Sequence, residues 1–128
     1  SRPNCSRIAR LMEQYYFYIV QGDRVGFGIA QDMKDRSQKY SSHTGRVVNF
    51  PYVYAGYKPH AKALERTIKS VMFDDIWLVE DWRTEWFNDN ITVEMFKETV
   101  DRLIAERHYN VECIAVDYDF TKRLTTAV

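Results

Sequence analysis

A glutamate on an expected helix is the residue whose position most strongly suggests chemistry in this sequence. Glu65 lies in the stretch ALERTIK. At about 100° per residue, it falls at the edge of an apolar helical stripe rather than on the solvent side. A carboxylate in that position is costly unless it is paired or bound to a metal ion. The sequence therefore predicts that Glu65 either binds a cation or forms an ion pair.

Two glycines and an arginine form a second unusual pattern nearer the N-terminus. Gly26 and Gly28 lie in an expected strand, and Arg36 follows Gly28 by eight residues on an expected helix. Interior glycine weakens a strand, and a purely structural hairpin would prefer β-branched residues there. We infer that something requires a bare backbone at this strand.

Three tyrosines could add hydroxyl groups to these candidates. Tyr16 and Tyr18 alternate along an expected strand over residues 15–21, so they share one face of it. Tyr40 lies one turn after Arg36 on the same helix face. Core or cross-strand packing is the competing interpretation for each of the three tyrosines.

Ordinary ion pairs compete with the functional interpretation of the charged residues. Arg36 could pair with Asp32 as a solvated helix residue, and Glu65 could pair with Lys69 four residues later. Glu85, next to two aromatic residues in the stretch EWF, is expected to be a structural anchor. These alternatives remain open at the level of the sequence.

The composition describes one domain with a substantial core. The chain has 128 residues, of which 45% are hydrophobic and 15% aromatic, so disorder is not expected. No apolar run approaches the ~20 residues of a membrane span, and no membrane association is expected. Cys5 and Cys113 fit neither a zinc site nor a disulfide scaffold, and we expect reduced thiols in a cytoplasmic protein. A single bridge between them is the alternative.

The charges are distributed unevenly although the net charge is zero. Residues 1–70 hold twelve Lys or Arg against five Asp or Glu, whereas residues 71–128 hold six against thirteen. This asymmetry suggests a basic working face with an acidic remainder, because attraction to phosphate depends on the local patch more than on the sum. Chance placement of solvated charges is the alternative.

The expected elements define an α+β class with an antiparallel or mixed central sheet flanked by helices. A hairpin turns at residues 22–23, and Asp32 caps the helix that follows it. A loop is expected at residues 41–45, and Pro51 is expected to interrupt the next extended stretch. Thr92 caps the last helix. The expected ranges are a helix or arm at 5–13, strands at 15–21, 25–30, 47–57, 76–79 and 111–117, and helices at 32–40, 59–72 and 92–107.

Three stretches carry a resemblance to the GIY-YIG nuclease superfamily. They read GFGIAQDMKDR, ALERTIKSVMF and RTEWF, and they resemble the pattern KIGIA…R…LE…EWF of phage-type and mobile-element domains. The resemblance covers about residues 16–90. It implies a single nuclease-like domain over residues 1–128, with a C-terminal helix and strand to about residue 117, in the cytoplasm of a bacterial or phage-infected cell.

The resemblance also implies a mechanism, which is hydrolysis of DNA phosphodiester bonds with one Mg²⁺ or Mn²⁺. Glu65 matches the metal-binding glutamate, and Arg36 matches the arginine that holds the scissile phosphate and offsets transition-state charge. Tyr16, Tyr18 or Tyr40 would help to deprotonate the attacking water. Gly28 would let the substrate approach closely. The other substrate-binding candidates are Lys34, Lys39, His43 and Arg46.

The sequence departs from the family pattern at several positions. Gly26 stands where the second signature strand normally carries a tyrosine, and Tyr40 stands where some members carry a histidine. Phe17, rather than a neighbouring tyrosine, could occupy the first signature position. Asn88 could match a late asparagine that supports the site.

These departures keep three functions open, and each predicts a different geometry. A metal-dependent endonuclease predicts that Arg36, Glu65 and a tyrosine converge in a groove. A catalytically lapsed copy that binds nucleic acid or protein predicts a basic groove without convergence. An acidic adaptor predicts that Glu65 pairs with Lys69 and that there is no groove. For a nuclease of this length, a homodimer or a partner protein would supply specificity.

Overall fold

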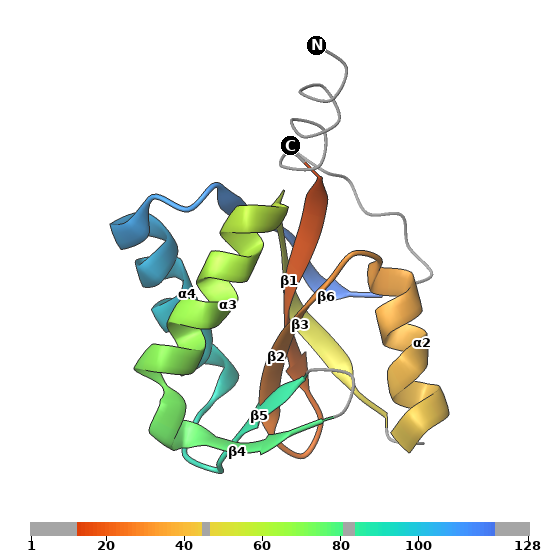
Figure 1. Ribbon diagram of the computed structural model, residues 1–128. Helices are drawn as coiled ribbons and strands as arrows, with labels where there is room; N and C mark the ends of the chain where they lie inside the picture. The colour runs from red at the N-terminus through yellow and green to blue at the C-terminus, as the bar shows by residue number, and fades with distance from the viewer. Residues whose placement is uncertain (1–12, 45–46, 81–83, 120–128) are drawn as a thin grey trace.

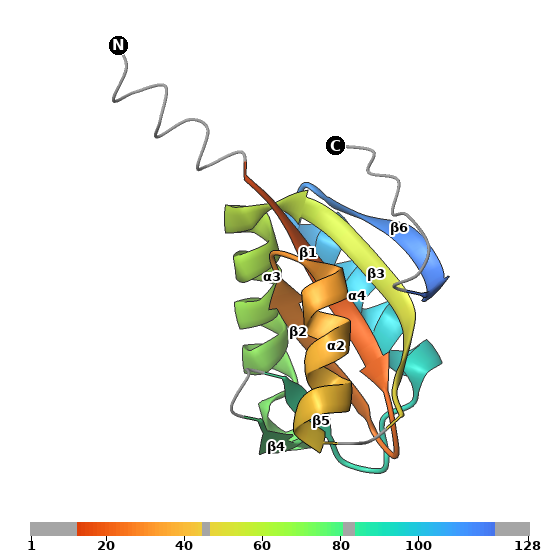
Figure 2. The same ribbon diagram turned by 90° about the vertical axis from the view of Figure 1, so that its right-hand side faces the viewer.

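The computed structural model describes residues 13–44, 47–80 and 84–119. It is an α+β fold in three layers, with one antiparallel sheet between helix α2 on one face and helices α3 and α4 on the other (Figure 1). Figure 2, turned by 90°, shows α2 in front of the sheet and α4 behind it. The sheet has six strands in the order β4-β5-β2-β1-β3-β6. The elements are β1 Gln14–Gln21, β2 Val25–Ala30, α2 Met33–Thr44, β3 Asn49–Tyr57, α3 Lys58–Val71, η1 Phe73–Asp75, β4 Ile76–Val79, β5 Glu85–Phe87, α4 Val93–Arg107 and β6 Val111–Tyr118.

Strand β1 is buried on both faces because helices cover both sides of the sheet. Phe17 and Ile19 enter the core under α3 and α4, whereas Tyr18 and Val20 enter a second core under α2. Successive side chains of a strand point to opposite faces. One strand therefore supplies two separate cores, and Phe17 lies on the opposite face from Tyr18.

The helix ends follow the capping residues that the sequence predicts. The Asp32 carboxylate accepts a hydrogen bond of 3.0 Å from the backbone N–H of Asp35, and Thr92 Oγ1 accepts one of 3.2 Å from Met95. Each bond satisfies a backbone donor that the first helical turn leaves without a partner. Helix α4 ends at His108, whose φ of 55° is left-handed.

Two expected breaks in secondary structure are wrong. Residues 41–44 are not a loop, because α2 continues to Thr44, and residue 45 lies outside the described residues. Serine and threonine only lower helix propensity, and the first strong helix breaker is Gly45. Pro51 does not interrupt β3, which runs through it. The β1–β3 register shifts between Ile19 and Gln21, opposite this part of β3, and a proline is tolerated at such an irregularity.

The other differences from the expected elements are smaller. Strand β5 was not expected, since three residues are too few to show a periodicity. The helical spacing of Val71 would place it with the apolar residues of α3, but 54% of it is exposed. Of the expected segment at residues 5–13, all but Glu13 lies outside the described residues. Cys113 is an exposed free thiol, and Cys5 lies outside the described residues. Among the described helices, none has the length and apolar character needed to cross a membrane.

Candidate functional site

A hydrogen-bonded network joins Arg36 to two tyrosines and a threonine. The Arg36 guanidinium donates to the Tyr18 hydroxyl over 2.8 Å, and the Tyr40 hydroxyl donates to the same oxygen over 3.1 Å. Thr84 Oγ1 bonds both hydroxyls, with a distance of 2.9 Å to Tyr18. These residues come from α2, β1 and the start of β5, so the fold brings together groups that lie up to 66 positions apart in the sequence.

The network is inside the α2 core except at its arginine. Tyr18, Tyr40 and Thr84 are fully buried or nearly so, whereas Arg36 is half-buried. Burial, followed by the neighbouring Tyr18, raises the pKa of Tyr40 well above its ordinary value of 10.0. Tyr40 therefore keeps its proton at neutral pH and serves as a donor, not as a base.

Arg36 borders an open groove between α2 and α3. The groove has a volume of about 810 Å³, and its charged lining residues are Asp32, Asp35, Arg36, Lys39 and Lys62. It lies at the end of β2, since β5 pairs only with Gly26 and Phe27 among the described residues. The Arg36 Nε atom is buried, and no described residue accepts a hydrogen bond from it. A guanidinium has five N–H donors, so Arg36 retains donors for a ligand.

A second cluster, of three charged residues, lies on the α3 side of the sheet. Lys69 Nζ is 2.8 Å from Glu85 Oε1 and 3.7 Å from Glu65 Oε1. The Glu85 side chain is only 3% exposed and that of Glu65 13%. Burial of Lys69 favours the neutral amine, but the hydrogen bond to Glu85 and the charge of Glu65 outweigh it and raise the pKa of Lys69 above 10.5. The expected position of Glu65 at a stripe edge, with Lys69 as its partner, is therefore confirmed.

The two clusters meet through consecutive residues at the start of β5, which lies between β2 and β4 in the sheet. Thr84 belongs to the network on the α2 side. Glu85 pairs with Phe27 across β2 and β5, and therefore faces the same α3-side core as Phe27. Arg36, Tyr18 and Tyr40 thus converge, whereas Glu65 belongs to the cluster on the other face and does not line the groove beside Arg36. The full convergence that the endonuclease interpretation predicts is therefore not seen. Of the two expectations of the adaptor interpretation, the Glu65–Lys69 pair is present, but a groove is present as well.

The remaining predicted site residues divide into three groups. Tyr16 is only half-buried, and burial and then Asp32 raise its pKa, but the hydrogen bonds of the network do not include it. Lys34 is exposed, and Lys39 pairs with Asp35 at 3.4 Å. Gly28 lies opposite Tyr18 in the hairpin. The side chain of His43 and all of Arg46 lie outside the described residues.

The bare backbone at Gly26 has a packing explanation. A Cβ atom there would lie 2.7 Å from Cε3 of Trp86 and 2.8 Å from the carbonyl oxygen of Glu85. Trp86 is buried in the α2 core and contacts the Tyr40 ring edge-on at 6.2 Å. Gly26 thus makes room for the indole rather than for a substrate, and the tyrosine of the family pattern could not fit here without rearrangement.

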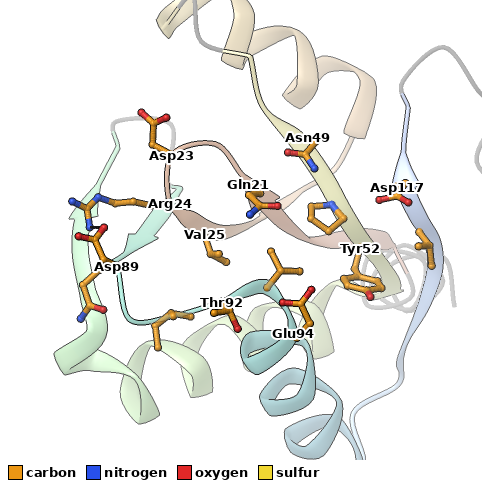
Figure 3. Close-up of a pocket in the computed structure, with 15 residues that line it drawn as sticks. Gln21, Asp23, Arg24, Val25, Asn49, Tyr52, Asp89, Thr92, Glu94 and Asp117 are labelled. Atoms are coloured by element: carbon orange, nitrogen blue, oxygen red, sulfur yellow. Dashed lines mark ion pairs between the residues drawn. The ribbon is translucent and has the colours of Figure 1, made fainter.

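A second, separate pocket contains Asn88, at the other end of the sheet (Figure 3). Its volume is about 510 Å³. The Asn88 side chain accepts a hydrogen bond from the Asn90 backbone, and it is not among the groove residues near Arg36. Arg24 pairs with Asp89 at 2.6 Å. The other charged lining residues are Asp23, Glu94 and Asp117, so this pocket would repel a phosphate.

The chemistry of Glu65 and Glu85 fits a small divalent cation. Two carboxylates offer hard oxygen donors, and Mg²⁺ binds through one or two carboxylates while keeping several waters. The Glu85 Oε2 atom is buried and has no hydrogen-bond partner among the described residues. The Lys69 ammonium already lies against both carboxylates, which shows that a cation can be held there. Within the described ranges, no cluster of three or more His, Cys, Asp or Glu side chains could hold a metal.

The sequence did not predict Thr84 as a site residue, and it predicted Glu85 only as a structural anchor. Nothing in the sequence marks Thr84, because it is a single hydroxyl before a short strand. Glu85 was expected as an anchor, and its burial with Lys69 confirms that role. A charged residue immediately before two large aromatic residues was the available signal for its burial.

Comparisons with known proteins do not assign the chain to a family. No family model matches it, and no curated protein or solved structure matches it significantly. The functional interpretation consequently depends on the geometry above and on the sequence resemblance.

Proposed function

We propose that this chain is a metal-dependent endonuclease that hydrolyses DNA phosphodiester bonds. The observation that carries the proposal is the position of Arg36, which is held by Tyr18 at the border of a groove that also contains Lys39 and Lys62. A half-buried arginine with free donors suits the two oxygens of a phosphate better than a lysine would.

Arg36 would bind the scissile phosphate and stabilise the charge that develops on it. The Tyr18 hydroxyl is bonded directly to Arg36 but is fully buried, so it would orient the arginine rather than contact the phosphate or the attacking water. Tyr40 and Thr84 would act as positioning residues, because both hydrogen-bond to the Tyr18 oxygen. The proton that the water loses would pass to solvent, because Tyr40 retains its own proton and a neutral Tyr18 hydroxyl has no basic site for a second one.

Glu65, with Glu85 beside it, would hold the metal ion. A bound Mg²⁺ supplies an acidified water and charge for the leaving oxygen. Lys69 would have to leave one or both carboxylates when the ion binds, and its exposed fraction of 40% gives it a path to solvent. These residues lie on the face of the sheet opposite to α2, so a metal ion held by Glu65 and a phosphate held by Arg36 would have to meet beyond the end of β2.

A catalytically lapsed, nucleic-acid-binding domain is the second candidate. The observation in its favour is the Lys69 ammonium between the two carboxylates, which already neutralises the charge that a metal ion would neutralise. Gly26, which stands where the family pattern has a tyrosine, also favours a catalytically lapsed domain. In this case Arg36 would bind phosphate without cleaving it.

Cleavage of supercoiled plasmid DNA with Mg²⁺ or Mn²⁺ separates the two candidates. We expect nicking by the unaltered protein, loss of nicking in Glu65→Ala, and unchanged nicking in Glu98→Ala, an exposed glutamate on α4. Glu65→Ala leaves Lys69 paired with Glu85, so the fold should persist. DNA binding without cleavage on several substrates would establish the lapsed domain, and equal nicking by both variants would remove Glu65 from the mechanism.

A further inference from the structure

Several described cations on the helices form no ion pair although the chain has no net charge. Among the described residues, Arg24, Lys39, Lys58, Lys69, Lys97 and Arg102 each form an ion pair. Five other cations form none, and they are Lys34, Arg36, Lys62, Arg66 and Arg107. Lys62 and Arg66 lie on α3 itself. Charges left without counterions along one element are typical of a surface that meets a polyanion.

Arg66 and Arg107 line a small hollow between α3 and the end of α4. Its volume is about 270 Å³, and Thr67, Ser70 and Tyr109 add hydroxyl groups to the lining. The two helices are in contact on the same face of the sheet (Figure 1). The hydroxyls of Thr67 and Tyr109 form a hydrogen bond of 2.8 Å, which links α3 to the segment that follows α4 within the lining of the hollow.

The chemistry of this hollow suits a phosphate. Two guanidinium groups offer forked donors, and hydroxyls can donate to the remaining oxygens. A cation in the last turn of a helix stabilises that end of the helix, which accounts for Arg107. It does not account for Arg66, an exposed residue on a different helix that lines the same hollow.

The position of the hollow relates it to the groove that contains Arg36. Lys62 lines the groove and Arg66 lines the hollow, and residues four apart lie on one face of a helix. The groove and the hollow therefore border the same exposed face of α3, where four residues rise about 6 Å along the helix axis.

We propose that Arg66 and Arg107 form a second phosphate-binding site, which holds the nucleic-acid backbone beyond the phosphate bound at Arg36. The inference rests on the proposed function for its substrate. It extends the nucleic-acid surface from the groove, across Lys62 on α3, to the end of α4.

The test is the salt dependence of binding to a short fluorescein-labelled DNA duplex, measured by anisotropy in EDTA so that no cleavage occurs. A plot of log K against log salt has a negative slope, and the loss of one phosphate contact makes that slope shallower by about 0.9. We expect this shallower slope, with weaker binding at low salt, in Arg66→Gln and in Arg107→Gln. Arg102→Gln is the matched control, because Arg102 lies on α4, is exposed and pairs with Glu106.

The outcomes separate this inference from the nuclease proposal. Unchanged slopes in both variants, with normal binding by the unaltered protein, would overturn the second site and leave the nuclease intact. A shallower slope in a protein that never cleaves DNA would support the second site and reject the nuclease. Absence of DNA binding by the unaltered protein would overturn both. Thermal unfolding of each variant establishes that a change in binding does not come from misfolding.

Discussion

The guanidinium of Arg36 is held by Tyr18 through two kinds of contact. Its Nη1 atom donates to the Tyr18 hydroxyl over 2.8 Å, and its central carbon lies 5.6 Å from the centroid of the Tyr18 ring. Because Tyr18 is itself fixed by Tyr40 and Thr84, the arginine is oriented before any ligand arrives. Such preorganisation reduces the entropy that binding would otherwise cost.

Replacing Tyr18 by phenylalanine tests this arrangement. Tyr18→Phe keeps the ring but removes the acceptor of Arg36, so DNA cleavage should fall at least tenfold. The buried hydrogen bonds should cost about 1–2 kcal/mol of the free energy of unfolding. Urea unfolding and plasmid nicking measure the two effects. Tyr16→Phe, on the same strand face but outside the network, is the comparison, and an equal loss there would contradict the assignment of Tyr18.

Removing the Lys69 ammonium tests the charge balance of the second cluster. Lys69→Met leaves the buried Glu85 carboxylate without its cation. We expect the free energy of unfolding to fall by about 1–3 kcal/mol. This is less than the 3–5 kcal/mol of a fully buried pair, since Lys69 is partly exposed. Lys39→Met is the matched control, because Lys39 is equally exposed but its partner Asp35 is in solvent, so the cost should be below ~1 kcal/mol.

The same variant tests the metal site without any assay of activity. If Glu65 and Glu85 bind Mg²⁺, the ion should restore stability to Lys69→Met and should stabilise it more than the unaltered protein, in which Lys69 competes. Chemical denaturation with and without Mg²⁺ gives this difference. An identical effect of Mg²⁺ on both proteins would place the metal elsewhere.

Much of the fold could be predicted from the sequence because its elements are long and have clear boundaries. The caps at Asp32 and Thr92 and the apolar face of α4 are local patterns, and the structure confirms them. Three-residue strands carry no such pattern, so β5 was missed. The site was predictable only in part, since Arg36 and Glu65 had distinctive spacing. Thr84 could not be identified from the sequence, because only its tertiary contacts with Tyr18 and Tyr40 place it in the network.

The close contact between Gly26 and Trp86 predicts an unequal response to two alanine substitutions. Gly26→Ala should destabilise the protein by about 1–3 kcal/mol, because the added methyl group meets both a buried ring and a backbone oxygen. Gly22→Ala is the control, because a Cβ there would lie 3.4 Å from a methyl group of Val48. Denaturant midpoints compare the two. Comparable costs would show that Gly26 is not required for packing.

Alkaline pH should destabilise the fold through its buried tyrosines. Burial is the main cause that raises the pKa of both Tyr40 and Tyr54 above 10.0. Above pH ~10 the unfolded chain releases these protons while the folded protein keeps them, so stability falls as pH rises. Lys69, with a raised pKa, adds to the same trend above 10.5. Tyrosinate absorbance followed with circular dichroism should show these tyrosines ionising only as the protein unfolds, and Tyr40→Phe should weaken the dependence.

The arrangement of Thr84 and Glu85 has a consequence for how this domain can change over evolution. Thr84 and Glu85 are consecutive in the sequence, where the three-residue strand β5 begins. Thr84 provides a hydroxyl to the α2 side of the sheet, and Glu85 provides a carboxylate to the α3 side. A slip of one position would exchange the two faces, so a single-residue insertion or deletion between β4 and β5 that shifted this pairing would disrupt both clusters together. Natural variation in the length of that connection should therefore be tolerated only where it leaves the pairing of β5 with β2 unchanged.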